Sequence, residues 1–135
     1  MFSRAVNEIV DRIANASRYG PPPPELYAEL RTALMYEADN HLDPTISASL
    51  RLIADLLPIF RQWMDIEYQR GSQAIVILDA ACNAIATLSF NVLDVVSSKG
   101  SLVSNSQMFL GRVANNVINT ATLQDMELHR DQKPS

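Results

Sequence analysis

The sequence contains little cysteine, histidine or glycine, and each shortage excludes a class of protein. Cys82 is the one cysteine among 135 residues, so no disulfide can form within the chain. Four glycines, none of them in a P-loop or G-x-G-x-x-G pattern, argue against a loop that binds phosphate through its backbone. The two histidines, His41 and His129, belong to no metal-binding or nucleophile motif. We therefore predict a protein that is not an enzyme and that carries no cofactor.

Basic residues are also scarce, and they form no run. Eleven Lys and Arg residues against fifteen Asp and Glu residues give a net charge of -4, so a nucleic-acid partner is not expected. The N-terminal residues reach Ser3 and Arg4 too early to hold the apolar core of a signal peptide. These features predict a cytoplasmic protein, in whatever cell or host produces it. Cys82 lies among alanines in a helical pattern, which predicts a buried, reduced thiol.

A long apolar window covers residues 74–93, which is close to the length of a membrane span. Asp79, Asn83 and Asn91 interrupt it, and each of these side chains is costly in lipid. We therefore predict that the window is a buried core helix, and we expect no membrane span.

Apolar residues recur at helical spacing through most of the chain. The pattern predicts an all-α fold, an elongated bundle of four or five helices with long antiparallel members, formed by a single domain over residues 1–135. Ser3 is a plausible N-cap, Pro24 suits a first helical turn, and Asp43 followed by Pro44 is a strong start signal. The expected helices cover residues 3–19, 24–42, 44–70, 72–98 and 102–128.

Proline gives two further expectations. Pro58 lies inside the third expected helix on its polar side, so we predict a bent but continuous helix with Pro58 facing solvent. Residues 20–24 contain four consecutive prolines, which predict a stiff arm that holds the first helix away from the bundle. That helix could then pack either in cis or on a second copy in trans. Residues 129–135 are polar, and we expect a flexible tail there.

The helix over residues 72–98 has more apolar surface than a small bundle needs. Leu78, Ala81, Ile85, Leu88, Val92 and Val95 recur at alternating gaps of three and four residues. Polar residues occupy about a third of the helical wheel, and Phe90 projects among them. This surplus favours self-association as a dimer or larger species, although the other helices could also cover these faces within one chain. The interface candidates are Phe2, Ile9, Ile13, Trp63 and Phe90.

One pair of residues suggests a different kind of site. Glu37 and His41 are four positions apart on the second expected helix, which is a spacing that can ligate a metal or transfer a proton. No further ligand pattern accompanies them, so they are weak candidates. Our leading hypothesis is a non-enzymatic scaffold, adaptor or chaperone-like binder that self-associates through an apolar helix face. The alternative is a small-molecule or metal-binding bundle, with its ligand near Glu37, His41, Trp63 and Asp79.

Overall fold

The computed structural model describes residues 2–132, and within them the chain forms five α-helices and no strand. The predicted all-α helical fold is therefore confirmed. Internal contacts divide the chain into two units, one over residues 2–80 and one over residues 81–132. The helices are α1 (Arg4–Ser17), α2 (Pro24–Asn40), α3 (Pro44–Gln69), α4 (Ala74–Val96) and α5 (Leu102–Gln132).

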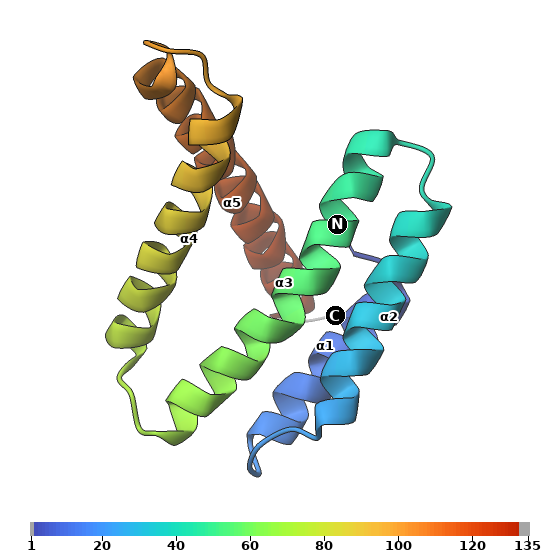
Figure 1. Ribbon diagram of the computed structural model, residues 1–135. Helices are drawn as coiled ribbons and strands as arrows, with labels where there is room; N and C mark the ends of the chain where they lie inside the picture. Colours follow the sequence, from blue (N-terminus) through green and yellow to red (C-terminus); the bar gives the residue numbers. More distant parts are fainter. Residues whose placement is uncertain (1, 133–135) are drawn as a thin grey trace. The chain divides into compact units, whose positions relative to one another are not determined.

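The first unit is built around the packing of α1, α2 and α3. Helix α2 contacts both α1 and α3, and α2 and α3 run side by side in opposite directions (Figure 1). Val6, Ile9 and Ile13 form an apolar stripe at helical spacing on α1, and all three are buried in the core. Leu30 and Leu34 on α2 are fully buried against them. The apolar periodicity of these helices is thus satisfied inside one chain.

Small residues on α3 set how closely it packs against α2. Ser47, Ala54 and Pro58 are buried together with Leu50 at spacings of three and four residues. The Ser47 hydroxyl donates a hydrogen bond of 2.6 Å to the carbonyl oxygen of Ala38. Short side chains allow the two backbones to approach each other. Leu52 and Ile59, on another side of this helix, remain exposed.

The burial of Pro58 differs from the prediction that this residue faces solvent. Helix α3 is continuous through Pro58, as predicted, but this residue is buried rather than solvent-facing. The wheel grouped Pro58 with polar residues, whereas the packing face of α3 follows its small residues. Asp55, four residues after Arg51 on α3, forms an ion pair with Arg31 of α2 at 3.0 Å.

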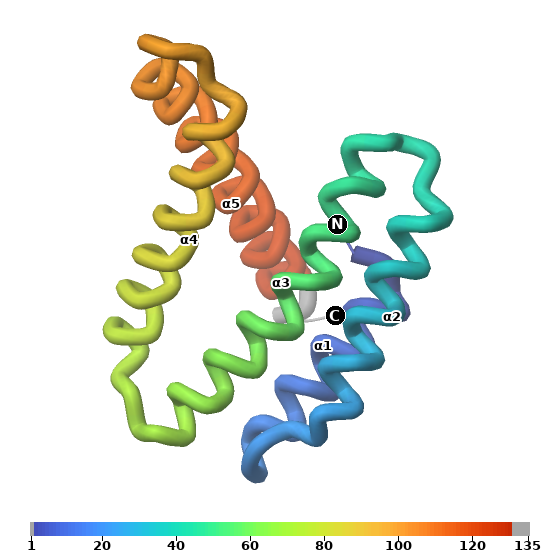
Figure 2. Tube along the Cα trace, viewed as in Figure 1, coloured from blue at the N-terminus to red at the C-terminus, as the bar shows by residue number. Residues whose placement is uncertain are grey.

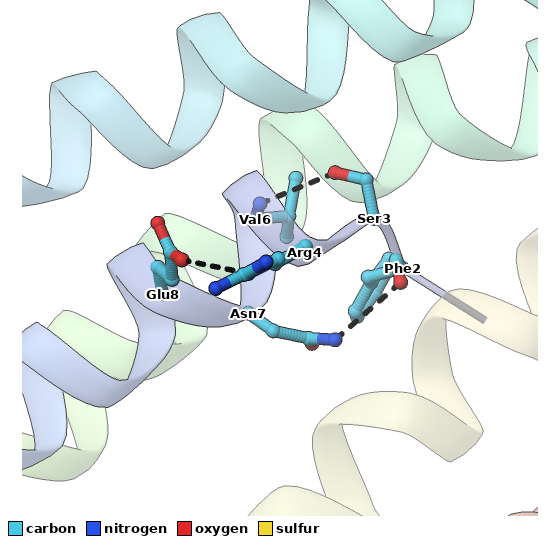
Figure 3. Close-up of polar contacts among 6 residues, drawn as sticks. All are labelled: Phe2, Ser3, Arg4, Val6, Asn7 and Glu8. Carbon is cyan, nitrogen blue, oxygen red and sulfur yellow. Dashed lines mark hydrogen bonds and ion pairs between the residues drawn. The ribbon is translucent and has the colours of Figure 1, made fainter.

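The predicted caps at Ser3 and Asp43 are confirmed. The Ser3 hydroxyl accepts a hydrogen bond from the Val6 backbone N–H, and Figure 3 shows this cap beside the ion pair of Arg4 with Glu8. In the same view, the Asn7 side-chain amide donates to the carbonyl oxygen of Phe2. The Asp43 carboxylate accepts from the backbone N–H groups of Thr45 and Ile46 at the start of α3. These local signals fix where the helices begin.

The proline segment folds α1 back onto its own chain. Pro22 is buried, and α1 packs against α2 directly after the connection. The expected arm that would hold α1 away is therefore corrected, because the connection brings the apolar stripe of α1 onto Leu30 and Leu34. Packing of α1 is in cis in this structure.

The second unit is a hairpin formed by α5 and all of α4 except its first turns. Figure 2 shows the chain leaving α4 and returning as α5 through residues 97–101. Gly100 has a φ of 89°, a conformation that a side chain would disfavour. The Asn105 side-chain amide donates to the Ser97 hydroxyl at 2.9 Å and closes the turn. Helix α5 continues to Gln132, beyond the predicted end at 128, and the rest of the expected tail, residues 133–135, lies outside the described residues.

Candidate functional site

The hairpin of α4 and α5 exposes most of its apolar side chains. Within residues 81–132, Leu93 is the one buried large apolar side chain. From Val113 to Leu128 on α5, every large apolar side chain is more than a third exposed. In the hairpin part of α4, residues 81–96, the large apolar side chains that are about half exposed or more are Ile85, Leu88, Phe90, Val92, Val95 and Val96. Exposed apolar surface of this extent is typical of an interaction site.

An apolar groove lies between the two helices of the hairpin. It has a volume of about 370 Å³. Ser89 and Ser106 are its only hydroxyl-bearing residues. The residues that line it are Cys82, Ile85, Ala86, Ser89, Phe90 and Leu93 from α4, and Ser106, Phe109, Leu110 and Val113 from α5. Such a surface suits an apolar side chain better than a charged ligand.

Phe90 is the predicted interface residue that lies in this groove. Its side chain is 55% exposed, and it lines the groove together with buried Leu93 and half-buried Phe109. The sequence singled out Phe90 as an aromatic residue in a polar stripe. It gave no indication that Phe109, nineteen positions later, would share the same groove, because their proximity depends on the turn at residues 97–101.

The polar residues of α4 follow one side of the helix. Asp79, Asn83, Thr87, Asn91 and Asp94 recur at gaps of four, four, four and three residues. The Thr87 hydroxyl donates to the Asn83 carbonyl oxygen, and the Asn91 side-chain amide donates to the Thr87 carbonyl oxygen. These polar groups are satisfied by their own helix, so this stripe can face water.

Two expectations about α4 are corrected by its exposure. The apolar window was predicted to be a buried core helix, but its residues are almost all exposed, and none of the most apolar part is buried. Cys82, predicted to be a buried thiol, is exposed. By length and composition alone, α4 is also apolar enough to cross a membrane. Helical periodicity shows which side of a helix is apolar, but it does not show whether another element covers that side. The prediction of burial therefore went further than the pattern allowed.

The interface candidates of the first unit already pack within the chain. Ile9 and Ile13 are buried in the core, and Phe2 packs against it, so these three are corrected to core residues. Trp63 is half-buried and meets Phe60 edge to face, with ring centroids 6.4 Å apart. Burial in cis leaves Ile9 and Ile13 no surface for a partner.

The weak candidates Glu37 and His41 do not share a helix face. Helix α2 ends at Asn40, and His41 has the extended backbone of a C-cap residue. Glu37 accepts a hydrogen bond from the Ser3 backbone N–H at 3.2 Å, and the His41 ring accepts one from the Asp43 backbone N–H. Within residues 2–132, no three His, Cys, Asp or Glu side chains are grouped so that they could hold a metal ion.

The ligand site expected near Glu37, His41, Trp63 and Asp79 is not assembled. Ser47 donates a hydrogen bond to Ala38 at one end of the α2–α3 pair, and Tyr27 donates one to Asp65 at the other. Glu37 is ten residues from Tyr27 along α2, and Trp63 is two residues from Asp65 in the direction of Glu37. Glu37 and Trp63 are therefore separated by about 12 Å along the helix axis.

A polar cluster in the first unit could not be predicted from the sequence. Asp65 accepts hydrogen bonds from the Ser17 hydroxyl at 2.9 Å and from the Tyr27 hydroxyl at 2.5 Å. Burial, followed by the hydrogen bond to Asp65 and its negative charge, raises the pKa of Tyr27 far above its usual range. Because these residues are 38 and 48 positions from Asp65, no local spacing could have identified the cluster.

A second concave region adjoins this cluster. It has a volume of about 510 Å³ and includes Arg18, Arg61, Asp65 and Tyr68 in its lining. The Nε atom of Arg61 is buried and has no hydrogen-bond partner among the described residues. Since solvent does not reach this nitrogen, a ligand could not reach it either without a rearrangement. We therefore interpret the cluster as a structural contact between helices α1, α2 and α3.

Comparisons with known proteins give no relative for this chain. No family model, no curated protein sequence and no solved structure matches it.

Proposed function

We propose that this protein is a non-enzymatic protein–protein interaction protein, a scaffold or adaptor that self-associates through its α4–α5 hairpin. The observation that carries the proposal is the contrast between the two units. The first buries its apolar stripes in a core built from α1, α2 and α3. The second buries only Leu93 among its large apolar side chains and leaves the others exposed or half-buried within the described residues. Apolar surface that a chain does not cover itself is a common site of association.

The amount of exposed apolar surface supports association. A large apolar side chain has on the order of 100 Å² of surface, and those on the hairpin are on average about half exposed. Together they present on the order of 800 Å², which is about what each partner buries in a stable dimer. The hairpin could therefore support a specific interface.

The polar stripe of α4 favours a protein partner over a membrane. Its five polar side chains run along the whole helix, and two of them, Asp79 and Asp94, are carboxylates. Carboxylates inside a bilayer are costly, whereas a helix with one polar and one apolar side suits a bundle surrounded by water.

The experiment that tests this proposal is sedimentation equilibrium of the full chain over a wide concentration range. We expect a dimer or larger species for the wild type. Replacement of Leu88 and Val92 on α4 by serine should shift the chain toward the monomer, because both side chains are about half exposed on the hairpin. The control is Leu42→Ser, which removes a fully exposed leucine outside the hairpin. A wild-type monomer at every concentration would contradict the proposal.

A further inference from the structure

The exposed surface of α4 includes a second apolar face, which shares Ile85 with the groove and otherwise lies outside it. Leu88 and Val92 are about half exposed, and neither lines the groove shared with α5. With Ala81, Ile85 and Val95 they recur at gaps of four, three, four and three residues. This is the spacing of a helix that packs lengthwise against another helix. Closing the groove against α5 would leave Leu88 and Val92 uncovered.

We infer that this face of α4 packs against the same face of α4 in a second copy of the chain, in an antiparallel, two-fold symmetric contact. The inference rests on the proposed self-association and specifies its geometry. In a two-fold contact the same patch serves both subunits, so the patch must be complementary to itself. This patch carries no charge, because Asp79 and Asp94 lie on the other side of the helix. Two copies can therefore meet there without repulsion.

Side-chain sizes favour the antiparallel direction. In an antiparallel pair centred between Ile85 and Leu88, these two residues face each other across the contact, and small Ala81 faces the larger Val92. In a parallel pair, Ala81 would face Ala81 and leave a gap, while Val92 would face Val92. Interiors pack at high density, so pairing a small residue with a larger one is preferred.

A second copy also suits this face better than a lipid surface. Helix α4 alone could span a membrane by length and composition. However, the face that runs through Leu88 and Val92 covers only part of the helix, and the polar stripe runs along the opposite side. A helix with this division is expected to pack against another helix while its polar side stays in water.

Disulfide trapping in the full chain tests the contact. In a Cys82→Ser background, one chain carries Ala81→Cys and another carries Val92→Cys, and each is oxidised with oxidised glutathione, alone and as an equal mixture. The antiparallel contact predicts that the mixture forms mainly mixed disulfide dimers, identified by mass, and that each variant alone forms few. The matched control pairs Asn83→Cys with Asn91→Cys, which are centred on nearly the same point of α4 but lie on its polar side, and this mixture should form few dimers. Circular dichroism confirms that each variant is folded.

Each other result overturns the inference in a distinct way. Like-with-like disulfides would show a parallel contact. No disulfide, with wild-type chains that still associate in sedimentation, would place the interface elsewhere and leave the proposed function standing. No disulfide together with a wild-type monomer would contradict both. No disulfide together with co-sedimentation of the wild type with phosphatidylcholine vesicles would assign this face to a membrane.

Discussion

The hydroxyl of Tyr27 on α2 donates a hydrogen bond to the carboxylate of Asp65 on α3, and so joins two helices across 38 residues of sequence. Tyr27 is only 7% exposed, and its neighbourhood favours the protonated phenol. The same carboxylate accepts the Ser17 hydroxyl, so α1 is joined at this point as well. The region of the first unit where Ser17, Tyr27 and Asp65 meet is thus stabilised by polar contacts beside an apolar core.

This contact predicts a loss of stability at high pH. The pKa of Tyr27 is raised in the folded state, whereas in the unfolded chain it stays near 10. Below pH about 10 both states hold the proton and the contribution is complete. Above it, the unfolded state releases the proton first, so the free energy of unfolding falls as pH rises toward the folded-state pKa.

Urea denaturation at pH 8 and at pH 11 measures this effect. At pH 8 the wild type should exceed Tyr27→Phe by about 1 kcal/mol, the usual net contribution of such a hydrogen bond. At pH 11 the difference should shrink. Tyr36→Phe, at a 70% exposed tyrosine, is the control and should change neither value. An unchanged difference at the two pH values would contradict the assigned environment of Tyr27.

The cap of α3 predicts a cost when its side chain is removed. Asp43 accepts hydrogen bonds from the backbone N–H groups of Thr45 at 2.8 Å and Ile46 at 3.3 Å. Asp43→Ala should lower the free energy of unfolding by about 1 kcal/mol, because two donors at the helix start lose their acceptor. Chemical denaturation checks this value against Asp39→Ala, which removes an exposed carboxylate in the same region. Equal effects of the two substitutions would argue against the cap.

Close packing of α2 and α3 predicts that a larger residue at Ala54 is not tolerated. Ala54 is fully buried in this contact. Ala54→Leu should destabilise the first unit by about 1–3 kcal/mol, because the added atoms force the helices apart. The matched control is Ala28→Leu on the exposed side of α2, which should be close to neutral. A thermal melt compares the two, and a neutral Ala54→Leu would mean that the helices pack more loosely.

The thiol of Cys82 predicts a concentration-dependent reactivity. Because Cys82 is exposed and lines the groove, it should react readily with a thiol reagent in dilute folded protein. Cys82 directly follows Ala81, which lies in the inferred contact of α4 with α4, so the rate should fall several-fold as the protein concentration rises and the chains associate. The control is Ser49→Cys in a Cys82→Ser background, at an exposed site on α3, whose rate should stay constant. A Cys82 rate that stays constant while the chains associate would argue against this contact.

The helices themselves could be predicted from local sequence. Ser3, Asp43 and Pro24 mark helix starts because a cap or a first-turn proline acts through hydrogen bonds and backbone angles within a few residues. The stripe of α1 was predicted for the same reason, since Val6, Ile9 and Ile13 repeat at helical spacing. Phe90 was identified as a candidate from its place on the α4 wheel alone.

The neighbours of those helices could not be predicted in this way. Local patterns predicted that Pro58 faces solvent and that Cys82 is buried, and the structure reverses both. The contact of Tyr27 with Asp65 and the shared groove of Phe90 with Phe109 have no local signature either. Sequence periodicity determined which side of each helix is apolar, because that depends only on residues a few positions apart. Which of those sides became buried was decided by tertiary packing, because burial requires a surface brought close from a distant part of the chain.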